Sequence, residues 1–247
     1  MDELTQRQID ILKTIIQENT ETGDPVGSEI LEKKYKLGVS PATIRNEMVA
    51  LEKKGYLAKT HFSSGRVPSA KGFRFYIQHL MKEKELSTVD EVAYKHSIWD
   101  DRDKEYRMLA HAARILAQKT GLLSLVTTST GDLYYAGVCN VMQQHEENIP
   151  EAFTQNLLVR LDEVNFWEEI LKKFYVTDED ILFILGQEDF RDPMFDNWAS
   201  VFGEFESPNQ RGIIGVIGPK HIHYPVVVPQ IRFFSQLIGE LIRDQKS

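Results

Sequence analysis

The segment from Ser40 to Gly55 constrains the fold more than any other part of the sequence, because it carries both a helix start and a helix stop. Ser40 and Pro41 place a capping hydroxyl directly before a proline at the first helical position. Gly55 suits the left-handed backbone conformation that often follows the last turn of a helix. These signals predict a helix that begins at Pro41 and ends at about Lys54.

The two faces of this helix differ in chemistry. Ile44, Met48 and Leu51 recur at i, i+4 and i+7, so they form an inward apolar face. The opposite face is rich in the small, amide and guanidinium groups that read base edges in DNA. Its members are Ala42, Arg45, Asn46, Val49 and Lys53, with Thr43 on the flank. An ordinary solvated face is the alternative. We predict a recognition helix whose DNA contacts are Ser40, Ala42, Thr43, Arg45 and Asn46.

The segments that precede this helix predict two more helices. The first begins at Thr5 and carries apolar residues at a spacing of three to four. Ser28 caps a short second helix, with Ile30 and Leu31 expected on its inward side. A tight turn over residues 36–39 then leads to Ser40. The second helix, the turn and the recognition helix are therefore arranged as a helix-turn-helix.

A short hairpin follows the recognition helix. Residues 56–62 read as a strand, Ser63-Ser64-Gly65 as a turn and Arg66-Val67-Pro68 as the return strand, before Ser69 caps a fourth helix. This order is that of a winged helix-turn-helix. Five residues of the hairpin are expected to contact backbone phosphates or an adjacent minor groove. They are Lys59, His61, Ser63, Ser64 and Arg66.

The charge is divided unevenly along the chain. The net charge of the 247 residues is −8, which is unusual for a protein that binds DNA. Residues 1–84 carry about +3, and the stretch from Ser28 to Lys82 carries about +7. The remaining residues therefore carry about −11. A basic module joined to an acidic body is consistent with a protein that contacts phosphate with one end only.

The rest of the chain predicts a second domain in which strands and helices are mixed. Residues 85–104 are polar and are interpreted as a linker, and Glu105–Thr120 as an amphipathic helix. The chain thus divides into a winged helix at 1–84, the linker, and a regulatory and dimerisation domain at 105–247, in the α+β class. The further strands are expected at 122–128, 134–139, 181–185 and 212–217, and the further helices at 153–164, 166–175 and 228–243.

Enzyme and metal chemistry find little support in the sequence. Cys139, the single cysteine, excludes an internal disulfide and is expected to be a core thiol. His221 and His223 could supply two metal ligands, but their spacing matches no metal motif and such a pair is usually inert. No nucleotide-binding glycine pattern and no nucleophile motif occurs. We therefore expect no enzyme, no cofactor and no metal. No signal peptide or membrane span is seen, which favours the cytoplasm.

The same residues resemble those of the heat-inducible transcription repressor HrcA family. The most specific part is V-S-P-A-T-I-R-N-E-M at residues 39–48, followed by S-S-G-R-V-P at residues 63–68. Residues 4–8 and 22–28, the stretch from Leu51 to Leu57, the glycine-rich residues 212–219 and Tyr224 also match. Residues 133–137 and 184–188 look like further landmarks of the family. The resemblance touches both ends of the chain and most of its middle.

This resemblance implies a repressor that binds, as a dimer, an inverted repeat called CIRCE upstream of chaperone operons. It also implies a GAF-like domain after the winged helix, and activity that depends on the chaperonin GroEL until heat diverts it. The chain departs from the family in length: it is shorter between Val126 and Leu133, where members carry further strands and an inserted dimerisation domain. It departs again at residues 221–223, where His-Ile-His replaces the usual Arg-Met-Asp.

Two other functions stay open. The body could hold a small-molecule effector, with Trp198, Phe202 and Phe205 lining a pocket, although these residues are better explained as core filling. The chain could also be an interaction module that does not bind DNA. Salt-dependent binding to promoter DNA would exclude that last possibility. A thermal-shift screen with small metabolites, compared with a titration with GroEL, would separate the effector-controlled regulator from the heat-controlled one.

Overall fold

In the computed structural model, the chain separates into two compact units. Unit 1 comprises Met1–Lys82 with His221–Tyr224, and unit 2 comprises Glu83–Lys220 with Pro225–Ser247. The structure describes residues 4–35, 37–59, 65–101, 104–143, 151–174, 180–196, 198–206 and 211–244.

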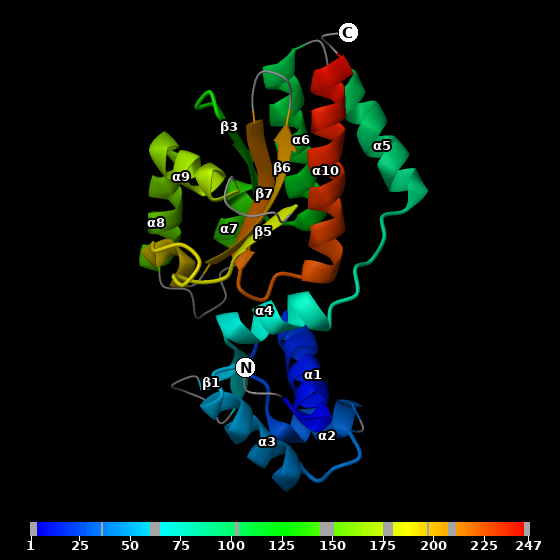
Figure 1. Cartoon of the computed structure of the whole chain (residues 1–247), viewed down its shortest axis with the longest axis vertical. Coiled ribbons are helices and arrows are strands. Elements are labelled where there is room, and N and C mark those ends of the chain that lie inside the picture. The colour runs from blue at the N-terminus through cyan, green and yellow to red at the C-terminus, as the bar shows by residue number, and fades with distance from the viewer. Residues whose placement is uncertain are drawn as a thin grey trace. The chain divides into compact units, whose positions relative to one another are not determined.

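Unit 1 has the expected winged helix-turn-helix order (Figure 1). Thr5 caps the first helix through a capping box with Gln8, and Gly23 ends it with a positive φ of 74°. The hairpin is antiparallel and pairs Leu57 with Pro68. The elements are α1 (Gln6–Thr22), α2 (Ser28–Tyr35), α3 (Pro41–Lys53), β1 (Leu57–Lys59), β2 (Arg66–Pro68) and α4 (Ala70–His79).

The core of unit 1 collects one apolar face from each helix. Leu31 of α2 is fully buried, but Ile30 is 44% exposed, so the expectation that both face inward is wrong for Ile30. Adjacent residues on a helix are separated by about 100°, and this short helix buries only the side that carries Leu31. The other core side chains include Ile11, Leu12, Ile15, Ile44, Leu51, Phe73 and Tyr224.

An ion pair with a tyrosine hydrogen bond ties α2 to α1. The Glu18 carboxylate on α1 accepts hydrogen bonds from Lys34 Nζ at 2.6 Å and from Tyr35 Oη at 2.7 Å. The bond from Lys34 lowers the pKa of Glu18 below its ordinary value of 4.5, against the opposing effect of burial. Burial and the Glu18 carboxylate raise the pKa of Tyr35 to about 12.

This network predicts a pH-dependent loss of stability. A carboxylate whose pKa is lowered by folding stabilises the native state above its unfolded pKa, and the contribution disappears as the pH falls through the folded pKa. Glu18→Gln should therefore lower the melting temperature of the full chain at pH 7, and the difference from wild type should shrink as the pH falls below 4.5 and vanish below the lowered pKa of Glu18. Glu21→Gln is the matched control, because Glu21 contacts the same lysine from a 61% exposed position. Equal losses for both variants would contradict this assignment.

Unit 2 is built on a five-stranded antiparallel sheet with the strand order β4-β3-β7-β6-β5. Helices α6 and α10 cover one face and α7, α8 and α9 lie on the other (Figure 1), which confirms the α+β class. The strands are β3 (Leu123–Thr128), β4 (Leu133–Ala136), β5 (Ile181–Ile184), β6 (Trp198–Glu206) and β7 (Arg211–Pro219). The helices are α5 (Thr88–Trp99), α6 (Glu105–Thr120), α7 (Val138–Gln143), α8 (Glu151–Leu161), α9 (Val164–Phe174), the short 3-10 helix η1 (Pro193–Asp196) and α10 (Tyr224–Asp244).

Packing across the sheet requires glycine at two of its central positions. Gly215 pairs with Phe202 across strands, and a Cβ there would lie 2.3 Å from the Phe202 ring. On the other face, a Cβ on Gly203 would lie 2.9 Å from Ile231 of α10. An apolar cluster on the α8 and α9 side includes Leu123, Leu125, Trp167, Ile170, Trp198, Phe202, Ile213 and Ile217.

Several expectations about unit 2 need correction. Residues 85–104, expected to be a linker, contain helix α5. The strand at 134–139 stops at Ala136, because Gly137 turns the chain with a φ of 86° into α7. Cys139 therefore lies on a helix and is exposed, so the prediction of a core thiol is wrong.

The stretch between Val126 and Leu133, where the chain is shorter than the family, forms a complete turn. β3 and β4 pair antiparallel, and Thr128 N donates to Asp132 O at 3.0 Å across the turn that joins them. Trp198, Phe202 and Phe205 lie on β6 and are buried, which supports core filling.

Across the described residues, no helix combines the length and the apolar character needed to cross a membrane.

Candidate nucleic-acid interface

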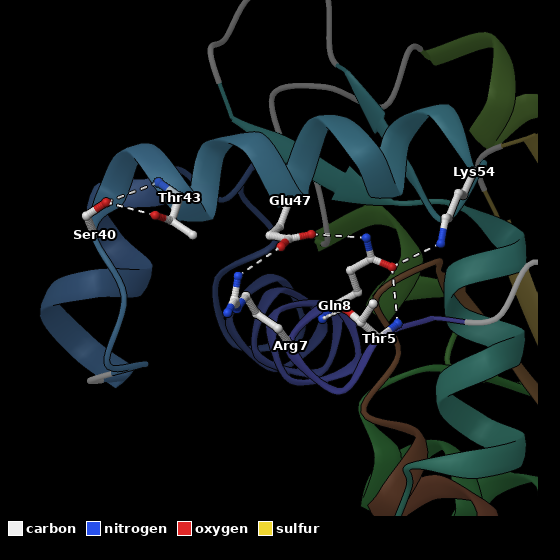
Figure 2. Close-up of polar contacts among 7 residues, drawn as sticks. All are labelled: Thr5, Arg7, Gln8, Ser40, Thr43, Glu47 and Lys54. Atoms are coloured by element: carbon white, nitrogen blue, oxygen red, sulfur yellow. Dashed lines mark hydrogen bonds and ion pairs between the residues drawn. The ribbon is translucent and has the colours of Figure 1, made fainter.

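The N-terminus of α3 is fixed by two hydroxyl groups. Ser40 has an extended backbone, and its Oγ accepts a hydrogen bond from Thr43 N at 3.2 Å. The hydroxyls of Ser40 and Thr43 also lie 3.0 Å apart, as Figure 2 shows. Ser40 is exposed and Thr43 half-buried, so both hydroxyls lie at the surface while they hold the first turn. Pro41 occupies the first position of the helix, as expected.

The faces of α3 are separated as the sequence pattern predicts. Ile44 and Leu51 are fully buried and Met48 is 3% exposed. The other face is open to solvent and brings the expected base-reading residues together on one surface, where it can accept or donate hydrogen bonds without displacing core atoms. Its exposed members are Ala42, Arg45, Asn46, Val49 and Lys53. Contact between this face and DNA stays a prediction.

A polar network sets the orientation of α3 on α1 (Figure 2). Gln8 is 6% exposed, and its amide nitrogen donates to Glu47 Oε2 at 3.0 Å. Its amide oxygen accepts from Lys54 Nζ at 3.1 Å and from the Thr5 backbone at 3.3 Å. Arg7 reaches the other Glu47 oxygen at 3.5 Å. Sequence reasoning missed this network, because its partners lie about 40 residues apart.

The two cationic residues of the wing differ in their surroundings: Lys59 is exposed to solvent, whereas Arg66 is paired with a carboxylate. Lys59 ends β1 and is exposed. Arg66 begins β2, but its side chain is only 13% exposed and its Nε donates to Glu52 Oε2 at 2.7 Å. Its backbone forms a bridge with Val26, at 2.8 and 3.0 Å. This geometry favours a role for Arg66 in holding the wing. His61, Ser63 and Ser64 lie outside the described residues.

A groove of about 570 Å³ runs between α2, α3 and the hairpin. Its lining combines three cations and one carboxylate with apolar side chains: Arg45, Lys59, Arg66 and Glu29 with Ile30, Met48 and Val49. Ile30 is the residue that the sequence pattern placed inside, and its exposure adds an apolar wall beside Arg45. A groove of this kind can hold a phosphate at its charged side and a methyl group at its apolar side.

Metal binding has no geometric support in the part of the chain that the structure describes. Within those residues, no group of three or more His, Cys, Asp and Glu side chains lies close enough to hold an ion. His223 is exposed and His221 half-buried, on either side of the buried Ile222.

The two wing cations should respond differently to substitution. Lys59→Ala should weaken binding to all DNA sequences alike and reduce the salt slope of log K by about 1, because it removes one phosphate contact. It should leave the melting temperature unchanged. Arg66→Ala should cost about 1.5–3 kcal/mol of folding free energy, because a hydrogen bond between charged groups is lost. Arg66→Ala with unchanged stability and a reduced salt slope would instead make Arg66 a phosphate contact.

Two family models match the chain. The model described as the HrcA protein C terminal domain matches residues 47–228, and the model of the LexA DNA binding domain matches residues 1–64. A solved structure titled "Crystal structure of a hypothetical protein at 2.2 A resolution" has a TM-score of 0.78 and 18% identity, covers 98% of this chain and is itself covered in full, so it has the same fold.

Curated relatives match about half of the chain. The heat-inducible transcription repressor HrcA of Pelotomaculum thermopropionicum is 44% identical over 128 residues, which are 51% of this chain and 34% of that protein. The repressor of the same name from Clostridium tetani is 46% identical over 125 residues, 50% of this chain and 36% of that protein. The matched stretch spans about a third of each relative, and both are named as repressors, not as enzymes. Because the HrcA model covers residues 47–228, the chain belongs to the HrcA family.

Proposed function

We propose that the protein is a DNA-binding transcriptional repressor of heat-shock operons, which encode chaperones. The observation that carries this proposal is the exposed face of α3, which gathers Ala42, Arg45 and Asn46 on a helix capped by Ser40 and anchored to α1 through Glu47. The names of the relatives that match about half of the chain support it.

The residues divide into base readers and backbone contacts. Arg45 would bond guanine through two hydrogen bonds, Asn46 would do the same to adenine, and Ala42 or Thr43 would leave room for a thymine methyl group. Lys59 would contact a phosphate beside the recognition helix. The wing-tip residues His61, Ser63 and Ser64 are proposed as further backbone contacts from the sequence alone.

The operator would be an inverted repeat of the CIRCE type, read by a dimer. One winged helix covers a single half-site, so an inverted repeat requires two copies related by two-fold symmetry. The protein would act in the cytoplasm, where it meets the chromosome.

Heat would inactivate the repressor through unit 2. A domain whose stability margin is a few kcal/mol loses its folded fraction steeply with temperature, and a GroEL-type chaperonin would restore it. The resemblance suggests this partner. An exposed apolar segment at residues 181–185 would not be the cause, because Ile181, Leu182, Ile184 and Leu185 are all buried. Marginal stability would then reside in the whole unit.

A small-molecule effector is the second candidate. Thr127 and Glu204 both pair with Ile213, so their side chains lie on one face of the sheet. Thr127 Oγ1 and the Ser200 hydroxyl are buried, with no hydrogen-bond partner in the described part of the chain, and the buried Glu204 Oε1 has an ion-pair partner in Arg211 at 4.0 Å. Buried polar atoms of this kind are rare and call for an explanation, and a polar ligand would satisfy them. A stabilising metabolite in a thermal-shift screen would favour this candidate.

Footprinting on chaperone promoters tests the proposal directly. The full chain should protect two half-sites about one helical turn apart, or a multiple of it, with an affinity that falls steeply as salt rises. A scrambled promoter of equal length is the control. Equal affinity for both DNAs at every salt concentration would exclude a sequence-specific repressor.

A further inference from the structure

Gly27 lies directly before helix α2, at the position where a side chain often caps the first turn. Leu31 N donates to Gly27 O at 3.3 Å, so Ser28 is the first residue of the helix. The expectation that Ser28 caps this helix is therefore wrong. Glycine offers no side-chain acceptor to the first turn. Within the described residues, the backbone N–H groups of Ser28, Glu29 and Ile30 accordingly have no hydrogen-bond acceptor.

The first turn of α2 forms one wall of the groove between α2, α3 and the hairpin. Residues 27–30 all line that groove. The N-terminus of a helix carries a partial positive charge, and the N–H groups that the helix itself does not use point outward there. This combination binds anions, and phosphate groups in particular. An anion in the groove would therefore find hydrogen-bond donors at this wall.

The side chain of Ser28 is an independent indication of a ligand. Ser28 is 6% exposed and lines the same groove, and its hydroxyl forms no hydrogen bond within the part of the chain that the structure describes. A buried hydroxyl group without a partner is uncommon and calls for an explanation. A phosphate oxygen at the start of α2 would accept a hydrogen bond from this hydroxyl and from the backbone amides beside it.

Neither packing nor backbone strain within the described residues explains Gly27. Its φ lies outside the left-handed region, and a Cβ at this position would meet none of those residues within 4 Å. Gly65 is different, because a Cβ there would lie 2.9 Å from the Pro25 backbone. Glycine also occurs where a ligand approaches the backbone closely. A ligand at the amides of α2 would account for Gly27.

The charges that line the groove favour an anion. Arg45 and Lys59 each contribute a positive charge, and Glu29 contributes one negative charge. Arg66, the third cation, already pairs with Glu52 at 2.7 Å. Positive charge is therefore in excess. Glu29 is exposed, so its carboxylate can turn toward solvent when an anion enters.

We propose that the start of α2 is a phosphate site, in which the backbone amides of the first turn and the Ser28 hydroxyl donate hydrogen bonds to one phosphate group. In the proposed repressor this group is a phosphate of the DNA backbone beside the bases that α3 reads. The first helix of a helix-turn-helix crosses the DNA backbone while the second lies in the major groove, and helix N-termini supply such contacts. The inference rests on the proposed function and adds uncharged donors that fix the position of Arg45 over its base.

Two variants of the full chain test the site. Gly27→Ala places a methyl group where the phosphate approaches, and Ser28→Ala removes the hydroxyl. Each should weaken binding to promoter and to random DNA alike by about 10-fold, as expected for the loss of one hydrogen bond to a charged group. The salt slope of log K should not change, because no cation is removed. This result would distinguish both variants from Lys59→Ala.

Gly239→Ala is the matched control. Gly239 lies on α10, where a Cβ would be 3.4 Å from the nearest of the described atoms, an ordinary contact. This variant should bind DNA as the wild type does, and all three variants should keep the wild-type melting temperature. If Gly27→Ala and Ser28→Ala both bind DNA with wild-type affinity, the inference is overturned.

Promoter DNA with single neutralised phosphates locates the contact. A methylphosphonate replaces one phosphate at a time with an uncharged group. At one position in each half-site, the replacement should weaken binding of the wild type by about 10-fold and binding of Ser28→Ala far less, because this variant has already lost the donor. Equal losses for both proteins at every position would overturn the inference, whatever the melting temperatures are.

Free phosphate is the other source of the same ligand chemistry. If inorganic phosphate raises the melting temperature of the wild type but not of Gly27→Ala, while both bind DNA equally, the site is supported with free phosphate as its ligand. If Gly27→Ala weakens binding to all DNA but the wild type shows no promoter preference, the site is supported and the repressor proposal fails. Promoter preference of the wild type, with no effect of either variant on DNA or phosphate binding, would overturn the site and leave the repressor proposal standing.

Discussion

Arg45→Ala should lower affinity for the operator by about 1–3 kcal/mol, roughly 5- to 150-fold, while affinity for random DNA changes far less. Arg45 projects from the exposed face of α3, beside the groove that Lys59 and Ile30 also line. A guanidinium that bonds both acceptors of a guanine contributes only when that base is present. Its loss should therefore relax sequence preference at one position of each half-site.

Asn46→Ala should produce a loss of the same size at a different base pair. Lys53→Ala is the control within the same helix: Lys53 is exposed but lies in the last turn, and its loss should weaken specific and random DNA to the same small degree. Competition binding with operators that carry single base changes measures both effects. Equal losses on operator and random DNA for Arg45→Ala would make Arg45 a phosphate contact and would exclude base reading by this residue.

The recognition helix was predictable because its signals are local. The Ser40 cap, Pro41 at the first position and Gly55, with a φ of 80°, lie within 16 residues of one another. The inward stripe of Ile44, Met48 and Leu51 needs no knowledge of its partners. The helix Glu105–Thr120 was predictable for the same reason, and its bounds agree with the structure.

The sequence was less informative where the burial or pairing of a residue depends on partners far away in the chain. Polar residues made 85–104 look like a linker, but α5 is held by Tyr94 and Ile98, which need α6 and α10 to be buried. Strand β6 carries apolar side chains on both faces because helices cover both sides of the sheet, so it shows no alternation of apolar and polar residues. The ion pair between Arg66 and Glu52, 14 residues away, could not be foreseen from the sequence either, and the phosphate contact predicted for Arg66 stays a prediction.

Phe202→Ala should unfold unit 2 at a temperature lower by about 10 °C and leave unit 1 folded. Phe202 is fully buried at the centre of the sheet, where its ring fills the space beside Gly215. Removing a buried phenyl group costs about 3–5 kcal/mol, and each kcal/mol shifts the melting temperature of a domain this size by about 2–4 °C. The heat-control proposal requires this shift to lower the temperature at which operator binding is lost.

Differential scanning calorimetry of the full chain, with footprinting at each temperature, is the measurement. The winged-helix fragment 1–84 is a poor substitute, because Tyr224 belongs to unit 1, is 1% exposed and packs its ring 5.7 Å from Phe73. Tyr135→Ala is the control, since Tyr135 is 46% exposed on the edge strand β4 and should shift neither transition. If Phe202→Ala lowers the melting of both units together, or lowers unit 2 while operator binding persists above its transition, heat does not act by unfolding unit 2 alone. The effector-controlled regulator would then be the better account.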